Sequence, residues 1–559
     1  MWVVLRGDGL HGLVGYDPGV YYAAAAAFVH GLRPYGGFLL LHPPGSMLVL
    51  SPFAALGSVT SDSTGMAVAR FAVILLGTLN AILVTRIAHR FGLAAAITGG
   101  LFYALWAPVV VVENQTRLEP LGNTCLLLAL LFLLRRGRPV SAGAEVLAGL
   151  ALGAGASVKI WGVLPLLVVL GWQLLGRGWR STVRVAAGAV VAVSAICLPF
   201  FLMAPGDMFR MVLTDQLGRP RLHGALVARL YDLSSVPFWM PHARSPSIVV
   251  AVVGVLALTA LLLAWRERSA RVVIVLLVTQ TALLLQVPSY FQFYAVFVVP
   301  AAALTVAVAS EQVAGWLARR GRSPRIAGVG ALSAAVAVAG VVLVPIRVEA
   351  ARPFPGRQLG AAAGRQRCVL SDTPIALIEM NVLSRDLRNG CVVRIDVTGY
   401  TYEGEIARGP DGKPLSRQKD AAWQHQVLGY LTSGDALVLA RPETGLSGAS
   451  RREIARWPVL ARIHGYTLYA RPGGDVEPER TVSWEPNRHG EKIGPGRFRW
   501  CTALDAAAAD RPHVPPQAGR RRTEPRRRPR LRPWSSTGQL GSSRVGSPSE
   551  VSYIAVDGT

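Results

Sequence analysis

The chain has 559 residues, of which 51% are hydrophobic and only 16% are charged. A soluble protein carries about a quarter charged residues, so this composition argues against a purely soluble enzyme and against disorder along the whole chain. The net charge of +25 does not indicate a nucleic-acid partner, because the basic residues lie in short clusters between apolar runs and in one C-terminal block.

Residues 1–65 are mixed in character and contain polar and aromatic motifs. Asp17 lies in the turn-like segment Gly15–Tyr21, ahead of a helix rich in small residues, and His42 precedes two prolines. The apolar stretch 46–57 is short, so we expect a membrane-surface or re-entrant helix there. Because Asp17 precedes a proline, it is also typical of an Asx turn or a helix cap.

Residues 66–345 form a series of apolar runs near the length of about 20 residues that crosses a bilayer. Each run should be a helix, because lipid leaves no partner for bare backbone polar groups. We predict ten spans, at 66–86, 91–112, 118–134, 142–158, 160–176, 185–204, 247–265, 272–287, 291–310 and 327–345.

Every second connection between these runs is rich in arginine, which places those connections in the cytoplasm. The basic clusters are Arg86 and Arg90; Arg135, Arg136 and Arg138; Arg177, Arg180 and Arg184; Arg266, Arg268 and Arg271; and Arg319, Arg320, Arg322 and Arg325. The other connections, residues 1–65 and everything after 345 should therefore face outward. An outer N-terminal segment requires an earlier span, so we expect a first helix to be missing from the start. Only four of the 58 basic residues are lysines, a bias typical of GC-rich bacteria, so we expect a bacterial plasma membrane.

Residues 346–474 lose the membrane character and alternate between short β-rich runs and helix-like stretches. The β-rich runs are 368–370, 392–395, 436–440 and 466–470, and the helix-like stretches include 373–388 and 449–463. The pattern predicts a small extracytoplasmic α/β domain. The predicted fold class is thus an all-α polytopic membrane bundle of about ten spans, followed by this domain and by a disordered tail at 475–559 that is rich in Arg, Pro and Gly.

Cys368 and Cys391 lie 23 positions apart in the predicted outer domain. Because extracytoplasmic compartments are oxidising, the two residues can form a disulfide. The alternative is a pair of buried free thiols. The chain has five cysteines in all, too few for a disulfide scaffold.

The outward connections carry the residues that could perform chemistry. Glu113, Arg117 and Glu119 crowd the connection between two spans, where they could also be interface anchors. Lys159 is the first lysine of the chain and lies between two apolar runs. Such a cation faces a cavity or an anionic partner, or else snorkels to the interface. Tyr290 and Tyr294 open a later span and would also fit an aromatic belt.

All these residues fall on the same predicted side of the membrane. Carboxylates, cations and aromatic rings gathered at one interface favour a site that accepts an anionic, lipid-linked substrate from within the bilayer. The competing prediction is a transporter or flippase of lipid-linked substrates, which would show inverted repeats and charges at the midplane.

The motifs resemble the glycosyltransferase C superfamily, membrane enzymes that use polyprenyl-phosphate sugars. The resemblance is closest to the protein mannosyltransferases and the aminoarabinose transferases, and it covers about residues 15–310. It rests on the order of Asp17-x-x-x-Tyr21, Gly31-x-x-Pro-Tyr35, His42-Pro-Pro-Gly, Ala69-Arg70-Phe71 and Arg117-x-Glu119.

The resemblance implies roles for individual residues. Asp17 matches the first-loop acid that activates the acceptor hydroxyl, and Glu119 matches a second-loop acid that holds a divalent cation in some members. His42, Arg117 and Lys159 would bind the donor phosphate. Substrate-lining positions are Tyr21, Glu113, Tyr290 and Tyr294. The sequence departs from the family at Pro18, where members often carry a second acid.

The implied organisation is an outer loop with the catalytic acid at 1–65, a transmembrane glycosyltransferase core at 66–345, the α/β domain at 346–474 and the tail at 475–559. The implied reaction is inverting transfer of a hexosyl or pentosyl group from a polyprenyl phosphate to an extracytoplasmic glycan, lipid or protein. A single base with no second-face nucleophile favours one displacement. A divalent cation is a candidate cofactor, and membrane lipid is an expected partner.

Overall fold

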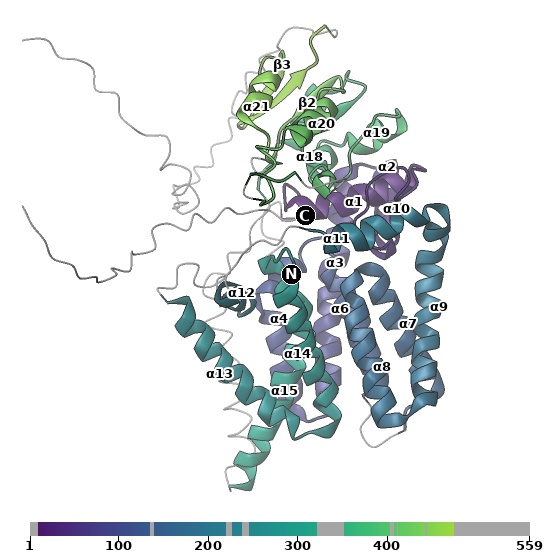
Figure 1. Cartoon of the computed structure of the whole chain (residues 1–559), viewed down its shortest axis with the longest axis vertical. Coiled ribbons are helices and arrows are strands. Elements are labelled where there is room, and N and C mark those ends of the chain that lie inside the picture. The colour runs from purple at the N-terminus through teal and green to yellow at the C-terminus, as the bar shows by residue number, and fades with distance from the viewer. Residues whose placement is uncertain are drawn as a thin grey trace, which may run out of the picture. The chain divides into compact units, whose positions relative to one another are not determined.

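A computed structural model describes residues 9–134, 139–219, 226–236, 245–320, 352–402, 407–410, 412–441 and 444–473. Figure 1 shows the order of its elements along the chain, from the N-terminal helices to the C-terminal sheet. The predicted span at 327–345, the arginines at 135–138 and the tail from 475 lie outside the described residues.

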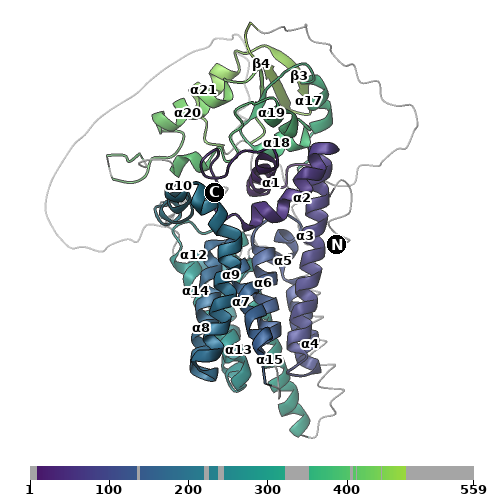
Figure 2. The same ribbon diagram turned by 90° about the vertical axis from the view of Figure 1, so that its right-hand side faces the viewer.

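Six helices within these ranges are long and apolar enough to cross a membrane. Each agrees with a predicted apolar run, and together they confirm the predicted multi-span bundle (Figures 1 and 2). They are α3 (Asp62–Ala88), η1 with α8 (Ile160–Gly162 and Val163–Arg177), α9 (Trp179–Met203), α13 (Pro246–Trp265), η4 with α14 (Arg268–Ala270 and Arg271–Gln286) and η5 with α15 (Gln292–Val298 and Val299–Arg319).

Four shorter apolar helices complete the described bundle: α2 (Gly45–Val59), α4 (Leu93–Leu105), α6 (Glu119–Leu133) and α7 (Ala142–Val158). The run predicted at 91–112 is divided, because the chain is extended at Trp106 before α5 (Ala107–Val112) begins. Pro108 in the first turn of α5 favours that break, since a proline fits a helix start better than its interior. The remaining short helices are α10 (Pro205–Phe209), η2 (Arg210–Thr214), α11 (Asp215–Leu217) and α12 (Leu226–Leu233).

Basic connections meet at one end of the bundle. Arg90 and Arg177 donate to the carbonyl oxygens of Leu134 and Leu133, at the C-terminal end of α6. A cation is favourable there, because the last carbonyls of a helix have no partner within the helix. In the next connection Arg184 pairs with the buried carboxylate of Glu145 at 2.9 Å. The clusters at 86–90 and 177–184, separate in sequence, therefore share one end of the fold.

The opposite end carries α1 (Tyr16–Val29) and α2, which pack against each other and against the C-terminal region. Twelve of the fourteen residues of α1 are buried. A Cβ atom at Gly19 would lie 2.7 Å from Ile375 of α18, so only glycine allows this approach. The small side chains of α1 thus let this helix lie between the bundle and the C-terminal α/β domain at 352–473, which is named the outer domain for its predicted side of the membrane.

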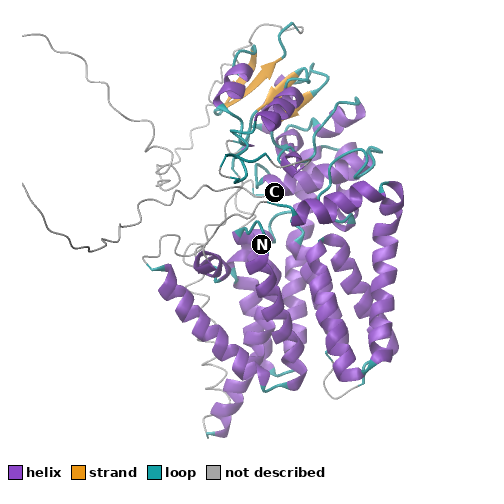
Figure 3. Ribbon diagram, in the orientation of Figure 1, coloured by secondary structure: helices purple, strands orange, loops and turns teal. Residues whose placement is uncertain are grey.

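The outer domain is built on a four-stranded mixed sheet, shown in orange in Figure 3, in the order β1-β2-β4-β3. β1 pairs in parallel with β2, and the other two pairings are antiparallel. This arrangement confirms the predicted small α/β domain. Its elements are α17 (Gly356–Ala362), β1 (Val369–Ser371), α18 (Pro374–Glu379), α19 (Leu383–Arg388), η6 (Gly399–Tyr402), α20 (Ala421–Leu431), β2 (Ala436–Val438), α21 (Gly448–Ile454), β3 (Val459–Ile463) and β4 (Tyr466–Ala470).

Two local predictions were wrong. The run at 392–395 is not a strand; it is an irregular segment in which Val392 is exposed while Ile395 is buried. The stretch at 449–463 is helical only in its first half, as α21, and its second half is strand β3. The second half becomes a strand because it pairs with β4. Its β-branched and aliphatic residues accept either conformation, and the neighbouring strand selects the extended one.

Buried polar contacts join the outer domain to the start of α3. The backbone N–H of Ser384 donates to the carboxylate of Asp62 at 2.9 Å, and the N–H of Ser63 donates to the side chain of Asn381 at 2.9 Å. Each contact satisfies a backbone donor at a helix start, where no partner within the helix exists. They hold the outer domain over the end of the bundle that carries α1.

The predicted disulfide between Cys368 and Cys391 is confirmed, with a Cα–Cα distance of 5.7 Å. It ties the start of β1 to the segment that leaves α19. The described free cysteines, Cys125 and Cys197, lie in the helices α6 and α9.

We expect replacement of Cys368 and Cys391 by serine to lower the free energy of unfolding of the outer domain by about 3 kcal/mol, since a loop of this length is then no longer closed in the unfolded chain. Thermal melts of the purified protein with and without reductant measure the change. Cys125→Ala is the control and should leave the effect of reductant unchanged. Two free thiols in peptides mapped without reductant would contradict the prediction.

Candidate functional site

The loop between α5 and α6 is held in place by buried polar contacts. Arg70 in α3 donates to the carbonyl oxygen of Asn114 at 3.2 Å, and Thr116 donates to the carbonyl oxygen of Pro18 in α1 at 3.2 Å. Glu113 accepts hydrogen bonds from Tyr103 at 2.8 Å and from Asn80 at 3.1 Å. Because these bonds are buried, they fix the loop against both the bundle and α1.

This loop presents Arg117 to the first acid of the chain. Arg117 Nη1 lies 3.0 Å from Asp17 Oδ2, and Arg117 Nε donates to Gln115 Oε1 at 2.7 Å. The guanidinium also lies 3.7 Å from the centre of the Phe293 ring. Asp17 sits in the first turn of α1, but the N-cap residue is Gly15, and it makes no side-chain cap bond. The Asp17 carboxylate therefore forms an ion pair with Arg117 across the site and does not cap the helix.

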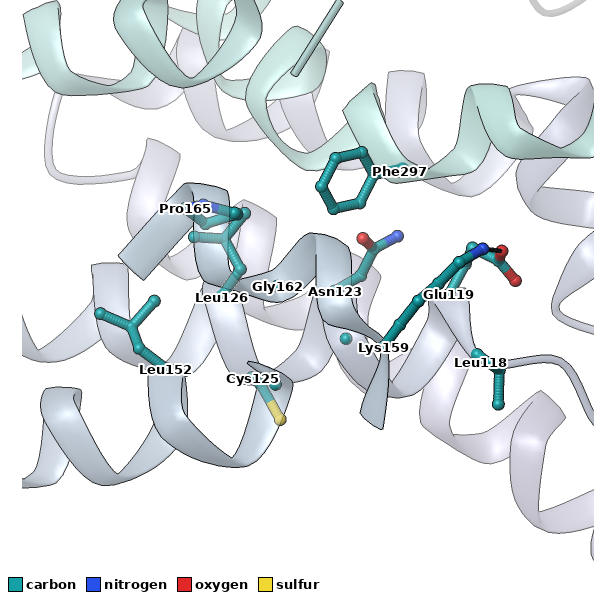
Figure 4. A pocket seen from close by; sticks show the side chains of 12 residues that line it. Leu118, Glu119, Asn123, Cys125, Leu126, Leu152, Lys159, Gly162, Pro165 and Phe297 are labelled. Atoms are coloured by element: carbon teal, nitrogen blue, oxygen red, sulfur yellow. Dashed lines mark hydrogen bonds and ion pairs between the residues drawn. The ribbon is translucent and has the colours of Figure 1, made fainter. Parts of the chain in front are cut away.

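A second buried ion pair lies beside the first. Lys159 Nζ is 2.7 Å from Glu119 Oε1, and both side chains are almost fully buried. Figure 4 shows this contact as a dashed line between the two side chains. The ammonium also lies 3.8 Å from the ring centre of Trp161 and 4.2 Å from that of Tyr294. Lys159 thus does not extend to solvent, which argues against simple snorkelling.

His42 lies against Tyr21 of α1. Its Nε2 is 3.4 Å from the Tyr21 hydroxyl, and the two rings meet edge to face. Burial lowers the pKa of His42 well below its usual value, and the nearby cations Lys159 and Arg219 lower it further. The imidazole is therefore neutral at pH 7, so it can offer a phosphate one N–H bond but no charge.

Two cavities open at this end of the bundle. The first, of about 440 Å³, lies between α6, α7, α8 and η5 with Lys159 and Glu119 on its wall. Most of its other walls are apolar, and Figure 4 shows Leu126, Leu152 and Phe297 among the lining side chains. The second, of about 430 Å³, is lined by Asp17, Val20, Tyr21, Leu39, Leu40, Leu41, His42, Arg219, Tyr294 and Asp396. An apolar pocket and a polar pocket are thus adjacent to the two ion pairs.

The structure brings together most of the site residues proposed from the sequence. Asp17, Tyr21, His42 and Tyr294 line the polar cavity, Glu119 and Lys159 line the apolar one, and Arg117 is bonded to Asp17. Two of the proposed site residues, Glu113 and Tyr290, do not line either cavity. Glu113 is engaged with Tyr103 and Asn80, and Tyr290 packs beside Tyr294 in a small aromatic cluster.

Sequence reasoning missed two residues of the polar cavity. Arg219 follows α11 in the long outer connection, and Asp396 belongs to the outer domain. Arg219 lies among other arginines in sequence, and Asp396 directly follows the run at 392–395 that was predicted to be a strand, so neither residue carried a signal. Only the docking of the outer domain places Asp396 beside Asp17.

The arrangement does not provide a metal site. Within the ranges that the structure describes, no group of three or more His, Cys, Asp or Glu side chains is placed to hold an ion. The two carboxylates that the resemblance connects with a cation, Asp17 and Glu119, are each paired with a basic side chain instead. These residues therefore do not fit a bound divalent ion in this conformation, and no catalytic step is assigned to one.

Part of the membrane region matches a known protein-family model. Residues 40–288 match the model described as glycosyltransferase family 87. Over these residues the chain is similar to glycosyltransferase family 87. The matched region contains His42, Arg117, Glu119 and Lys159, and it ends before Tyr290. It also excludes α1, so the placement of Asp17 in the site rests on the structure.

Two solved structures of ArnT share the fold of this chain. The chain is similar to ArnT from Cupriavidus metallidurans in the apo state, with a TM-score of 0.54, 18% identity, and coverage of 82% of this chain and 94% of that one. ArnT bound to undecaprenyl phosphate gives a TM-score of 0.51 at 17% identity, with coverage of 84% and 96%. The oligosaccharyltransferase of Archaeoglobus fulgidus, in complex with zinc and sulfate, gives 0.49 at 14% identity, with coverage of 77% and 64%. No curated protein sequence matches.

These findings confirm the resemblance to the glycosyltransferase C superfamily. Of the two predicted classes, the family match favours a glycosyltransferase over a transporter. The geometry of the site bears on the sugar, the acceptor and the stereochemistry.

Proposed function

We propose that this family 87 region transfers a sugar from a polyprenyl-phosphate donor to a hydroxyl group of an extracytoplasmic acceptor, with inversion at the anomeric carbon. The observation that carries the proposal is the convergence of the Asp17 carboxylate with Arg117 and Lys159 beside an apolar cavity. A polyprenyl-phosphate sugar has the matching parts, since it joins an apolar tail, an anionic phosphate and a reactive sugar carbon. The structure of ArnT with undecaprenyl phosphate supports the proposal, because that protein has the same fold.

Two cations are available for the donor phosphate. Arg117 uses Nε and Nη1 for Gln115 and Asp17, and among the described residues no partner accepts from its Nη2. Lys159 makes one hydrogen bond, to Glu119, and so has N–H groups to spare. Phosphate binding through these groups would be charge-assisted and therefore strong. Glu119 holds Lys159 in position, and His42 contributes as a neutral donor.

The chemical step follows from these positions. The acceptor oxygen attacks the anomeric carbon while its proton passes to the Asp17 carboxylate. The bond between that carbon and the phosphate oxygen breaks on the opposite face, and the polyprenyl phosphate leaves with the bonding electrons. Arg117 and Lys159 stabilise the charge that develops on the leaving phosphate. One base and one displacement give inversion.

The test is transfer by the full chain in lipid nanodiscs. The donors are undecaprenyl phosphates that carry radiolabelled mannose, glucose, arabinose or aminoarabinose, with the matching nucleotide sugars as controls. We expect release of label, or its transfer to an added acceptor, from at least one lipid donor and from none of the nucleotide sugars. Transfer from nucleotide sugars alone would contradict the proposed function.

The proposed orientation places the outer domain outside a bacterial plasma membrane, with the basic connections in the cytoplasm. We expect single cysteines to react with an impermeant maleimide in intact cells at Arg452→Cys but not at Arg180→Cys or Arg268→Cys. The background lacks Cys125, Cys197 and Cys501. All three sites should react after the cells are opened, which serves as the control. Labelling of Arg180→Cys but not of Arg452→Cys in intact cells would reverse the topology.

A further inference from the structure

Asp396 is an outer-domain carboxylate that lines the same cavity as Asp17. It lies in the irregular segment between α19 and η6, far from the membrane helices in sequence. Its side chain is buried, with 5% of its surface exposed. A buried carboxylate needs partners for its oxygens, so the contacts of each oxygen show what the residue does.

The two oxygens of Asp396 are used differently. Oδ1 accepts from the Tyr16 hydroxyl at 2.8 Å and from the backbone N–H of Gly399 at 2.7 Å. No hydrogen bond to Oδ2 is present among the residues that the structure describes. Gly399 lies so close that a Cβ atom there would overlap the carboxylate. Oδ1 is thus held against α1 and η6, while Oδ2 makes no hydrogen bond among the described residues of a carboxylate that lines the cavity.

Asp372 in the same domain shows what a purely structural carboxylate looks like. Its Oδ1 accepts from the backbone N–H of Ala440 at 2.8 Å, and its Oδ2 accepts from the hydroxyl of Thr444 at 2.7 Å and the N–H of Arg441 at 3.2 Å. Both oxygens are satisfied within the protein, and the residue does not line the polar cavity. Asp396 differs from Asp372 in its cavity position and in its unused oxygen.

The chemistry of the cavity indicates the kind of group that Asp396 binds. An ionised carboxylate oxygen can only accept, so its ligand must be a donor such as a hydroxyl. Arg219 shares the cavity. Burial raises the pKa of Asp396 above its usual value, and the hydrogen bonds from Tyr16 and Gly399, together with the cations Arg219 and Arg441, oppose that rise. Tyr21 and Tyr294 add aromatic surface to the same walls. Two carboxylates and two aromatic rings around one polar cavity suit a molecule with several hydroxyl groups on an apolar ring face.

We propose that Asp396 binds the acceptor, which is a sugar, by accepting a hydrogen bond from a hydroxyl next to the one that Asp17 deprotonates. The outer domain then supplies part of the acceptor site and the membrane region supplies the donor site. A serine or threonine side chain has a single hydroxyl, and that hydroxyl would be consumed at Asp17. This inference rests on the proposed function and names its acceptor class.

The test compares Asp396→Asn with the wild-type full chain in nanodiscs. The donor is whichever labelled undecaprenyl-phosphate sugar the wild type uses, and the acceptors are octyl glycosides of glucose, galactose and mannose below their micellar concentration. Asparagine keeps an acceptor oxygen for Tyr16 and Gly399 but offers the ligand a donor. We expect the KM for the octyl glycoside to rise at least tenfold. The KM for the donor should stay within twofold.

Two further variants separate binding from folding. Asp372→Asn should lower the melting temperature and leave the KM for the glycoside unchanged. Tyr16→Phe loosens Asp396 without changing the charge of the cavity, so it should raise the same KM by a smaller factor. If Asp396→Asn does not fold, the Tyr16→Phe variant serves as the test. An unchanged KM for the octyl glycoside in Tyr16→Phe would then overturn the inference.

The outcomes distinguish the two proposals. A wild type that uses no lipid donor at all refutes the proposed function. A wild type that uses a lipid donor but glycosylates only a Ser- or Thr-containing peptide, and no glycoside, overturns the inference alone. So does an Asp396→Asn variant whose KM for the glycoside equals that of the wild type.

Discussion

Replacement of Asp17 by asparagine is expected to lower the rate of sugar transfer by about 100-fold or more, the usual contribution of a positioned general base. Asparagine has nearly the same shape but does not accept a proton at neutral pH. The Asp17 carboxylate lies 3.0 Å from Arg117 and on the wall of the polar cavity, where an acceptor hydroxyl can reach it. Initial rates at saturating donor and acceptor measure the effect.

A matched control removes an ion pair that has no part in the chemistry and whose carboxylate is buried. Glu145 pairs with Arg184 at 2.9 Å at the opposite end of the bundle. Glu145→Gln should lower the melting temperature and leave the rate within a few fold of wild type. If Asp17→Asn instead keeps full activity, Asp17 is not the base. Glu119, the carboxylate on the wall of the apolar cavity, would then be the next residue to test.

The second large effect concerns Lys159. We expect Lys159→Met to abolish detectable transfer and to destabilise the protein by about 3–5 kcal/mol, because Glu119 is left buried without its partner. Two consequences are combined in this variant, the loss of a cation for the donor phosphate and the unpaired carboxylate. A single substitution cannot separate them.

The double variant Lys159→Met/Glu119→Gln separates them. Neither replacement carries a charge, so most of the lost stability should return, as is found when a buried ion pair is replaced by neutral groups. Transfer should stay undetectable, because the phosphate still lacks its cation. Thermal melts and rates with labelled donor are measured on the same preparations. Recovery of activity together with stability would show that the pair is only structural.

The membrane architecture could be predicted because it depends on local properties of the chain. Long apolar runs form helices in lipid whatever their neighbours. The runs at 66–86, 185–204 and 272–287 accordingly correspond to α3, α9 and α14. Short segments of the outer domain were less predictable. The stretch 449–463 divides into α21 and β3 because β4 lies beside its second half, a contact that local sequence does not encode.

The candidate site shows the same division. Alternating arginine clusters predicted that Asp17, Arg117, Glu119 and Lys159 lie on one side of the membrane, since positive charge favours the cytoplasmic side. They did not indicate which acid meets which cation. The tertiary structure pairs Asp17 with Arg117 and Glu119 with Lys159, at 3.0 and 2.7 Å. Pairing depends on how the loop at 113–118 packs against α1 and on how α6 packs against α7, which are long-range contacts.

The sequence by itself determined that this protein is a multi-span membrane bundle followed by a small α/β domain, with a cluster of charged residues at one face, because hydrophobic length and charge distribution act locally along the chain. Only the tertiary structure decided that Asp396 joins that cluster. It stands 379 positions after Asp17 in sequence, and it reaches the same cavity because the small residues of α1 and the contacts of Asp62 and Tyr16 let the outer domain dock closely. Such proximity arises from packing between distant segments, and no local pattern of residues reports it.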